Sequence, residues 1–191
     1  MKARNMIIKA LRRARKERGL RIISPNNYLS DGHIKKADHN LIVMTDLNEL
    51  GHEDWIVISA YYAMYQSALA LLTKIGLESK EHATTVAVLE YFFGEHISKE
   101  LIEKFNKLKR RKDEIEAIAI GEKYIDYLWK IKRARESVQY GISVTYKETG
   151  TVTKNARDFV SKIKLVLSEL DEALIDVIGK ETGELKKMAL S

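Results

Sequence analysis

Basic side chains are concentrated at the start of this 191-residue chain. Residues 1–37 hold eleven Lys and Arg side chains and two acidic ones, a net charge of +9, whereas the rest of the chain holds 22 basic and 25 acidic side chains. Such a segment attracts polyanions, because the phosphates that it neutralises release their counterions. The alternative is a solvated helix face that keeps the protein soluble. The residues that we predict to bind a polyanion are Arg12, Arg13, Arg15 and Lys16.

The sequence shows no pattern of cysteine or histidine residues that is typical of a disulfide or a metal site. There is no cysteine, which excludes disulfides and thiolate metal sites. The five histidines do not show metal-ligand spacing on one helix, and no Gly-rich phosphate loop occurs. We interpret His33 and His39 as solvated side chains of a surface helix. The sequence therefore predicts no metal site and no cofactor.

Three tyrosines are grouped within a strongly apolar segment, at positions 61, 62 and 65. Aromatic rings at helical spacing are typical of a core or an interface in which the hydroxyl groups find partners. Exposed rings of the same kind would instead offer a platform on which nucleic-acid bases stack. We favour packing for this cluster and keep stacking as the alternative.

Helices must position these side chains. The chain has one Pro, ten Gly and 45% hydrophobic residues, which favours long helices over a β fold with many turns. Segment 53–75 is apolar around most of its circumference, which predicts a central, buried helix. We expect a short basic helix over 3–18, followed by helices over 31–50, 53–75, 79–93, 98–120, 124–144 and 155–178.

The breakers and the charge pattern divide the chain into three parts. Gly19 and the Pro25 region end the first helix, so residues 1–30 are predicted to be a basic N-terminal helix and its linker. Residues 31–180 are predicted to form an all-α, antiparallel, up-and-down helical bundle. Residues 181–191 are predicted to be a flexible tail.

No uninterrupted run of about 18 apolar residues occurs, so we expect no membrane span. The longest apolar region, 55–72, is interrupted by Ser59, Gln66 and Ser67. The chain starts without the apolar core of a signal peptide, so we expect a cytoplasmic protein with no membrane partner. Two glutamines beside abundant Lys, Glu and Ile are typical of thermophilic proteins.

The order of several segments resembles the HEPN domain family, especially its small archaeal and bacterial members. The resemblance covers about residues 33–175 and rests on order and spacing rather than on any one motif. It is carried by an Ala near the start of the first helix, a Tyr-Tyr-Ala-Met-aromatic run in the second, and Lys-x-His at the third. The corresponding segments are HIKKADHNL (33–41), YYAMY (61–65), KEHATTVAV (80–88), RARESVQYG (133–141) and ARDFVSKI (156–163).

The resemblance implies an antiparallel bundle that commonly forms a homodimer and associates with RNA or nucleotides. Many HEPN proteins are metal-independent ribonucleases, and many are encoded beside a minimal nucleotidyltransferase as a toxin–antitoxin pair. Active members carry Arg-x(4–6)-His, and both copies of this motif meet across the dimer. That chemistry needs a base near the ribose 2′-hydroxyl and a cation near the scissile phosphate.

This sequence departs from the family pattern at the histidine. The resemblance places the arginine at Arg133 or Arg135, and Tyr140 stands where the histidine would be. A phenol with a pKa near ~10 is a poor base at neutral pH compared with an imidazole near ~6.5. Either arginine could still hold a phosphate, and the alternative for Arg135 is an ion pair on the helix surface.

Three functions are therefore considered. The first is a homodimeric binding module that holds RNA or a nucleotide through Arg133, Arg135 and the basic N-terminal segment. The second is a ribonuclease that uses Arg135 with Tyr140, or with a distant histidine such as His82. The third is a protein partner of a minimal nucleotidyltransferase, which is compatible with either. We rank the binding module first.

Overall fold

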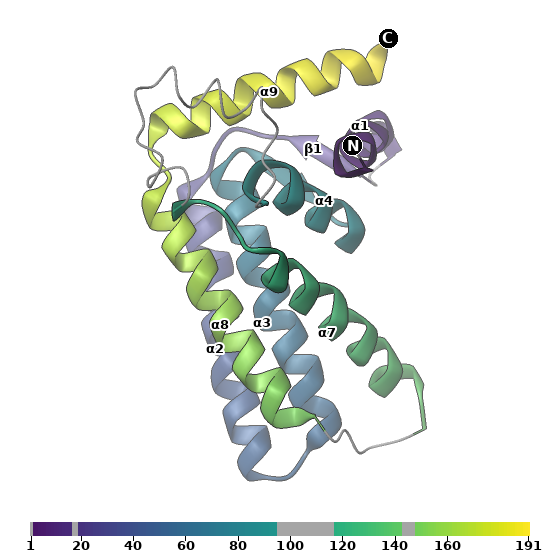
Figure 1. Cartoon of the computed structure of the whole chain (residues 1–191), viewed down its shortest axis with the longest axis vertical. Helices are drawn as coiled ribbons and strands as arrows, with labels where there is room; N and C mark the ends of the chain where they lie inside the picture. Colours follow the sequence, from purple (N-terminus) through teal and green to yellow (C-terminus); the bar gives the residue numbers. More distant parts are fainter. Residues whose placement is uncertain (1, 17–18, 95–116, 143–147) are drawn as a thin grey trace.

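The computed structural model describes residues 2–16, 19–94, 117–142 and 148–191. Four long helices run along the long axis of the molecule (Figure 1). They are α2 (Asn27–Glu49), α3 (Glu53–Lys74), α7 (Glu122–Tyr140) and α8 (Thr149–Glu169). Helix α3 packs against each of the other three. The predicted all-α bundle with a central second helix is confirmed. The helix expected over 98–120 falls mostly outside the described residues.

Local sequence explains how the α2–α3 hairpin forms. The side chain of Asn26 accepts a hydrogen bond from the Leu29 N–H and caps the start of α2. Gly51 adopts φ +76° between the two helices, a conformation that glycine tolerates best. Most side chains of α3 are buried, because apolar residues surround it on nearly all sides. It is the one helix among the described residues that is long and apolar enough to cross a membrane, but 72% of that stretch is buried inside the protein.

A second layer covers one end of the bundle (Figure 1). It contains α1 (Lys2–Arg12), the short 3-10 helix η1 (Arg13–Lys16), α4 (His82–Phe93) and α9 (Glu172–Leu190). Helix α1 packs against both α4 and α9. Two short strands, β1 (Leu20–Ile22) and β2 (Leu77–Ser79), pair antiparallel with Leu20 opposite Ser79. Segments from both ends of the chain therefore meet in this layer.

The N-terminal 30 residues differ from the expected helix and linker. The α1 side chains Ile7, Ala10 and Leu11 are buried in the main hydrophobic core. The presumed linker contains β1, and Leu20 has no exposed surface. The first bundle helix begins at Asn27 rather than near residue 31. The apolar stripe of α1 stabilises this docking, because burying it removes hydrocarbon surface from water.

The C-terminal part also differs from expectation. The single helix predicted over 155–178 is two helices, because the backbone is extended at Leu170 and Asp171. The Asp171 side chain then accepts a hydrogen bond from the Leu174 N–H and starts α9. Residues 181–191, expected to be a flexible tail, continue α9 to Leu190. Leu185 and Ala189 are buried there, and this apolar face fixes the helix against α1.

Candidate nucleic-acid and phosphate site

Helix α7 presents Arg135 to the bundle. Ile125, Leu128 and Ile131 are the buried residues of α7, and they repeat at helical spacing. Arg135 follows Ile131 by four positions, so it lies on the same side of the helix, one turn nearer the C-terminal end. The apolar stripe thus packs α7 on α3 and brings the arginine to the edge of that interface.

Three tyrosine rings surround the guanidinium of Arg135. Its Cζ atom lies 5.3 Å from the ring centroid of Tyr61, 5.9 Å from that of Tyr62 and 5.8 Å from that of Tyr140. These distances allow cation–π attraction. One Nη also donates a hydrogen bond of 3.4 Å to the Tyr62 hydroxyl. We call Arg135, Tyr61, Tyr62 and Tyr140 the arginine–tyrosine site.

The arginine–tyrosine site is open to solvent on one side. Tyr140 is 74% exposed and Tyr62 37% exposed, whereas Tyr61 is 8% exposed. Burial is the main reason that the pKa of Tyr61 rises to about 12, so this phenol stays protonated at neutral pH. Among the described residues, no carboxylate forms a salt bridge with Arg135. Its positive charge is therefore available to an anion that approaches beside the exposed rings.

His82 lies on the inner side of the same aromatic group. Its ring is 5.9 Å from Tyr61, 5.7 Å from Tyr65 and 5.1 Å from Trp129, measured between ring centroids. Both ring nitrogens are buried and have no hydrogen-bond partner. Burial and then the Lys132 charge lower the pKa of His82 to about 4. The imidazole is neutral at pH 7, but it packs among rings and its nitrogens do not reach the protein surface.

The neighbours of Arg135 on α7 have different roles. Lys132 forms an ion pair with Glu136 one turn along the helix, and this lowers the pKa of the Glu136 carboxyl. Arg133 is exposed to solvent. The structure therefore places Arg135 beside Tyr140, the other candidate for a catalytic role, and leaves Arg133 on the outer face of the helix.

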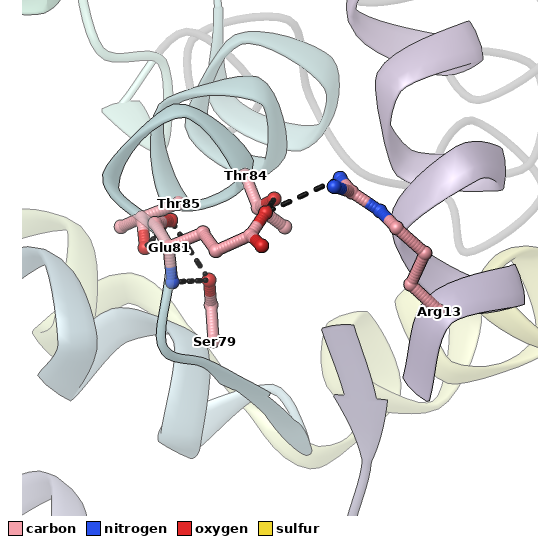
Figure 2. A network of polar contacts seen from close by, with 5 residues as sticks. All are labelled: Arg13, Ser79, Glu81, Thr84 and Thr85. Atoms are coloured by element: carbon pink, nitrogen blue, oxygen red, sulfur yellow. Dashed lines mark hydrogen bonds and ion pairs between the residues drawn. The ribbon is translucent and has the colours of Figure 1, made fainter. Parts of the chain in front are cut away.

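Two of the four N-terminal basic side chains predicted to bind a polyanion form contacts with other parts of this chain. Arg12 Nε donates a 2.8 Å hydrogen bond to the Ala189 carbonyl near the end of α9. Figure 2 shows Arg13 reaching Glu81, at a distance of 3.2 Å, beside Ser79 and Thr84. Both arginines are exposed, but these contacts hold α1 and η1 against α9 and α4. The side chains of Arg15 and Lys16 lie outside the described part of the structure.

Other polar predictions can also be placed. His33 is half-buried and its Nδ1 lies 2.7 Å from the Gln66 side-chain oxygen, so it is not the solvated side chain we expected, whereas His39 is exposed. Over the described ranges, no group of three His, Asp or Glu side chains could hold a metal ion. Tyr61 and Tyr65 pack as predicted, and the neighbouring Tyr62 contributes to the arginine–tyrosine site. The tyrosine spacing signalled this cluster, but it did not reveal that Tyr62 meets Arg135.

A family model of the HEPN domain matches residues 31–173, about three quarters of the chain. The chain belongs to the HEPN domain family. No curated protein matches the sequence. The HEPN match takes in α3, α4, α7 and α8 together with nearly all of α2. It leaves α1, β1 and most of α9 outside, so the layer at the end of the bundle is largely an addition to the HEPN domain.

Proposed function

We propose that this HEPN protein is a cytoplasmic, RNA- or nucleotide-associated binding protein whose ligand-binding centre is the arginine–tyrosine site. HEPN-family roles are often ribonuclease or nucleotide-related, which sets the general class. The observation that carries the proposal is the accessible Arg135 charge between three tyrosine rings. The guanidinium offers donors to a phosphate, and the exposed Tyr62 and Tyr140 rings offer faces to a base.

Substitution of Arg135 tests this proposal. Arg135→Ala should weaken binding of a short single-stranded RNA by about tenfold or more, because it removes a charge-assisted hydrogen bond of about 1.5–3 kcal/mol. Tyr140→Ala should weaken it by about five- to fiftyfold, as loss of one stacking platform does. Binding would be measured by fluorescence anisotropy at two salt concentrations, since phosphate contacts are salt-dependent.

A matched control is Arg157→Ala. This variant also removes one exposed arginine charge, but from α8 and outside the basic N-terminal segment, where the Arg157 Nη2 donates a 2.7 Å hydrogen bond to the Thr45 hydroxyl. It should bind RNA within about twofold of the wild type. Equal losses in Arg157→Ala and Arg135→Ala would show a general charge effect and would overturn the assigned site.

A ribonuclease activity is the second candidate, favoured by the 5.8 Å between the Arg135 Cζ and the Tyr140 ring. Arg135 would stabilise charge on the phosphate, and the Tyr140 hydroxyl would have to act as the base. His82 is a poor candidate for that base, because both of its nitrogens are buried among aromatic rings. Incubation with labelled RNA in EDTA distinguishes the two candidates: cleavage by the wild type, but not by Arg135→Ala, would establish the enzyme.

The proposal includes the assembly that the HEPN family suggests. We expect a homodimer in which the arginine–tyrosine sites of two copies lie close together, in a toxin–antitoxin or other stress or defence system. An adjacent gene for a minimal nucleotidyltransferase would support the alternative role as a protein partner of such an enzyme. Exposed Tyr62 and Trp55 on α3, at 37% and 55%, are consistent with a covered face in an assembly.

A further inference from the structure

A small pocket opens between α7 and α8, separate from the arginine–tyrosine site. Its volume is about 280 Å³, and α3 closes its inner side. This volume lies just below the range of about 300–1,000 Å³ that is usual for ligand pockets, which suits a small metabolite better than a drug-sized ligand. The apolar lining comes from all three helices and consists of Met64, Ile131, Ala134 and Val152.

The polar lining of this pocket carries one charge of each sign. Lys130 lies on α7 with Ala134 one turn further on, and Glu148 lies at the start of α8. The two do not form a salt bridge with each other in the structure, and both are exposed. The Glu148 side chain does not cap α8 either. Both charges are therefore available to a ligand at the mouth of the pocket.

The Tyr127 and Asn155 side chains also line the pocket and are half-buried. They add hydrogen-bonding groups between the charged mouth and the apolar floor. A ligand that matches this lining has a carboxylate for Lys130, an ammonium for Glu148 and an aliphatic group for the floor. Neither a polyanion nor an uncharged hydrocarbon satisfies both charges.

We propose that the α7–α8 pocket binds a free aliphatic α-amino acid. The carboxylate of the amino acid contacts Lys130, its ammonium contacts Glu148, and its side chain packs against Met64, Ile131 and Val152. Leucine and methionine have the size and polarity that the pocket accepts. The N-terminal residue of a peptide has no free carboxylate, and the C-terminal residue has no free ammonium. Neither end therefore offers both charges, and peptides are excluded.

Calorimetric titration of the full chain with L-leucine, leucinamide and N-acetyl-leucine tests this proposal. Leucine should bind at least tenfold more tightly than either analogue, because each analogue lacks one charge-assisted hydrogen bond. Lys130→Ala should reduce the preference for leucine over leucinamide to about twofold. Glu148→Gln should reduce the preference for leucine over N-acetyl-leucine to about twofold. This crossed pattern is specific to two separate charge contacts.

Two further variants complete the test. Ala134→Leu fills the pocket and should abolish leucine binding, while Lys154→Ala removes an exposed charge elsewhere on α8 and should leave it unchanged. Because Lys130→Ala alters only an exposed residue, the test does not depend on Ala134→Leu folding normally. Equal affinity for all three probes, or no binding of leucine up to 10 mM, would overturn the proposal. The proposal would also be overturned if adenosine bound, Ala134→Leu blocked that binding, and leucine did not bind.

Discussion

Arg135 illustrates how neighbouring rings define the role of a charged side chain. On an open helix surface an arginine is bound by water and nearby carboxylates, and contributes little to stability. Here its guanidinium lies over Tyr61, Tyr62 and Tyr140, which restrict its orientation without neutralising its charge. The sequence identified Arg135 and Tyr140 but left an ion pair as the alternative. In the described part of the structure no carboxylate forms a salt bridge with Arg135, although its charge contributes to the lowered pKa of Glu136.

His82 should make the protein sensitive to mild acid. Its pKa is about 4 in the folded protein, against about 6.5 when unfolded, so between these values the unfolded chain binds more protons. The free energy of unfolding therefore falls as the pH drops from about 6.5 to 4. The full shift corresponds to about 3 kcal/mol, and partial exposure of the site reduces this to about 2 kcal/mol.

Urea denaturation of the wild type and of His82→Phe, at pH 7 and at pH 4.5, measures this effect. His82→Phe keeps an aromatic ring beside Tyr65 and Trp129 and removes the group that titrates. The variant should lose about 2 kcal/mol less than the wild type between the two pH values. An identical loss in both proteins would assign the acid sensitivity to other groups, such as Glu136, whose pKa is lowered in the folded protein by its hydrogen bond with Lys132.

At the scale of elements, α1 is the clearest case in which a sequence pattern allowed two interpretations. Its basic residues suggested either a segment that binds polyanions or a solvated helix face that keeps the protein soluble. The structure shows that the apolar stripe of α1 packs on α4 and α9. Arg12 then contacts carbonyls near the end of α9, where a positive charge is also favoured by the helix dipole.

Truncating the stripe of α1 should therefore destabilise the whole fold. Ile7 has no exposed surface, and Ile7→Ala should lower the free energy of unfolding by about 2–4 kcal/mol through lost burial and a residual cavity. Lys9→Ala, on the exposed side of the same helix, should change it by less than about 0.5 kcal/mol. Urea denaturation at pH 7 compares the two, and equal stability of both variants would mean that α1 is not docked in solution.

The docking of α1 also affects how RNA binding by the basic segment should be tested. Deleting residues 1–22 would remove the buried stripe of α1 and the strand β1 along with the basic charges. Any loss of RNA affinity would then combine unfolding with lost electrostatics. Charge reversal at exposed positions is the cleaner experiment for the basic segment.

At the scale of the whole molecule, we expect association through the outer face of α3. Trp55, Ile58 and Tyr62 repeat at helical spacing, and Trp55 and Tyr62 are exposed. Trp55→Glu should shift the protein from a dimer to a 21.9 kDa monomer in size-exclusion chromatography with light scattering, since a buried charge without a partner is costly at an interface. The control is Tyr28→Glu, which changes an 85% exposed aromatic residue on α2. A wild type that is monomeric at 100 µM would contradict the proposed dimer.

The sequence by itself determined the helical class, the central position of α3 and the HEPN pattern. These features depend on local periodicity and on the order of segments, which are present in the chain before it folds. Arg135 and Tyr140 also emerged from that pattern. The presence of α9 as a packed helix did not, because residues 181–191 are polar enough to resemble a tail until their buried face meets α1.

Only the tertiary structure decided which partner each charge finds. Arg12 and Arg13 lie in the same basic run as the other candidates, yet they contact Ala189 and Glu81, which are distant in the chain. Arg135 meets three tyrosines because α7 packs on α3. The physical reason is that the energy of a charge depends on what surrounds it in space. Spacing along the sequence fixes the face of a helix, but the fold determines what that face meets.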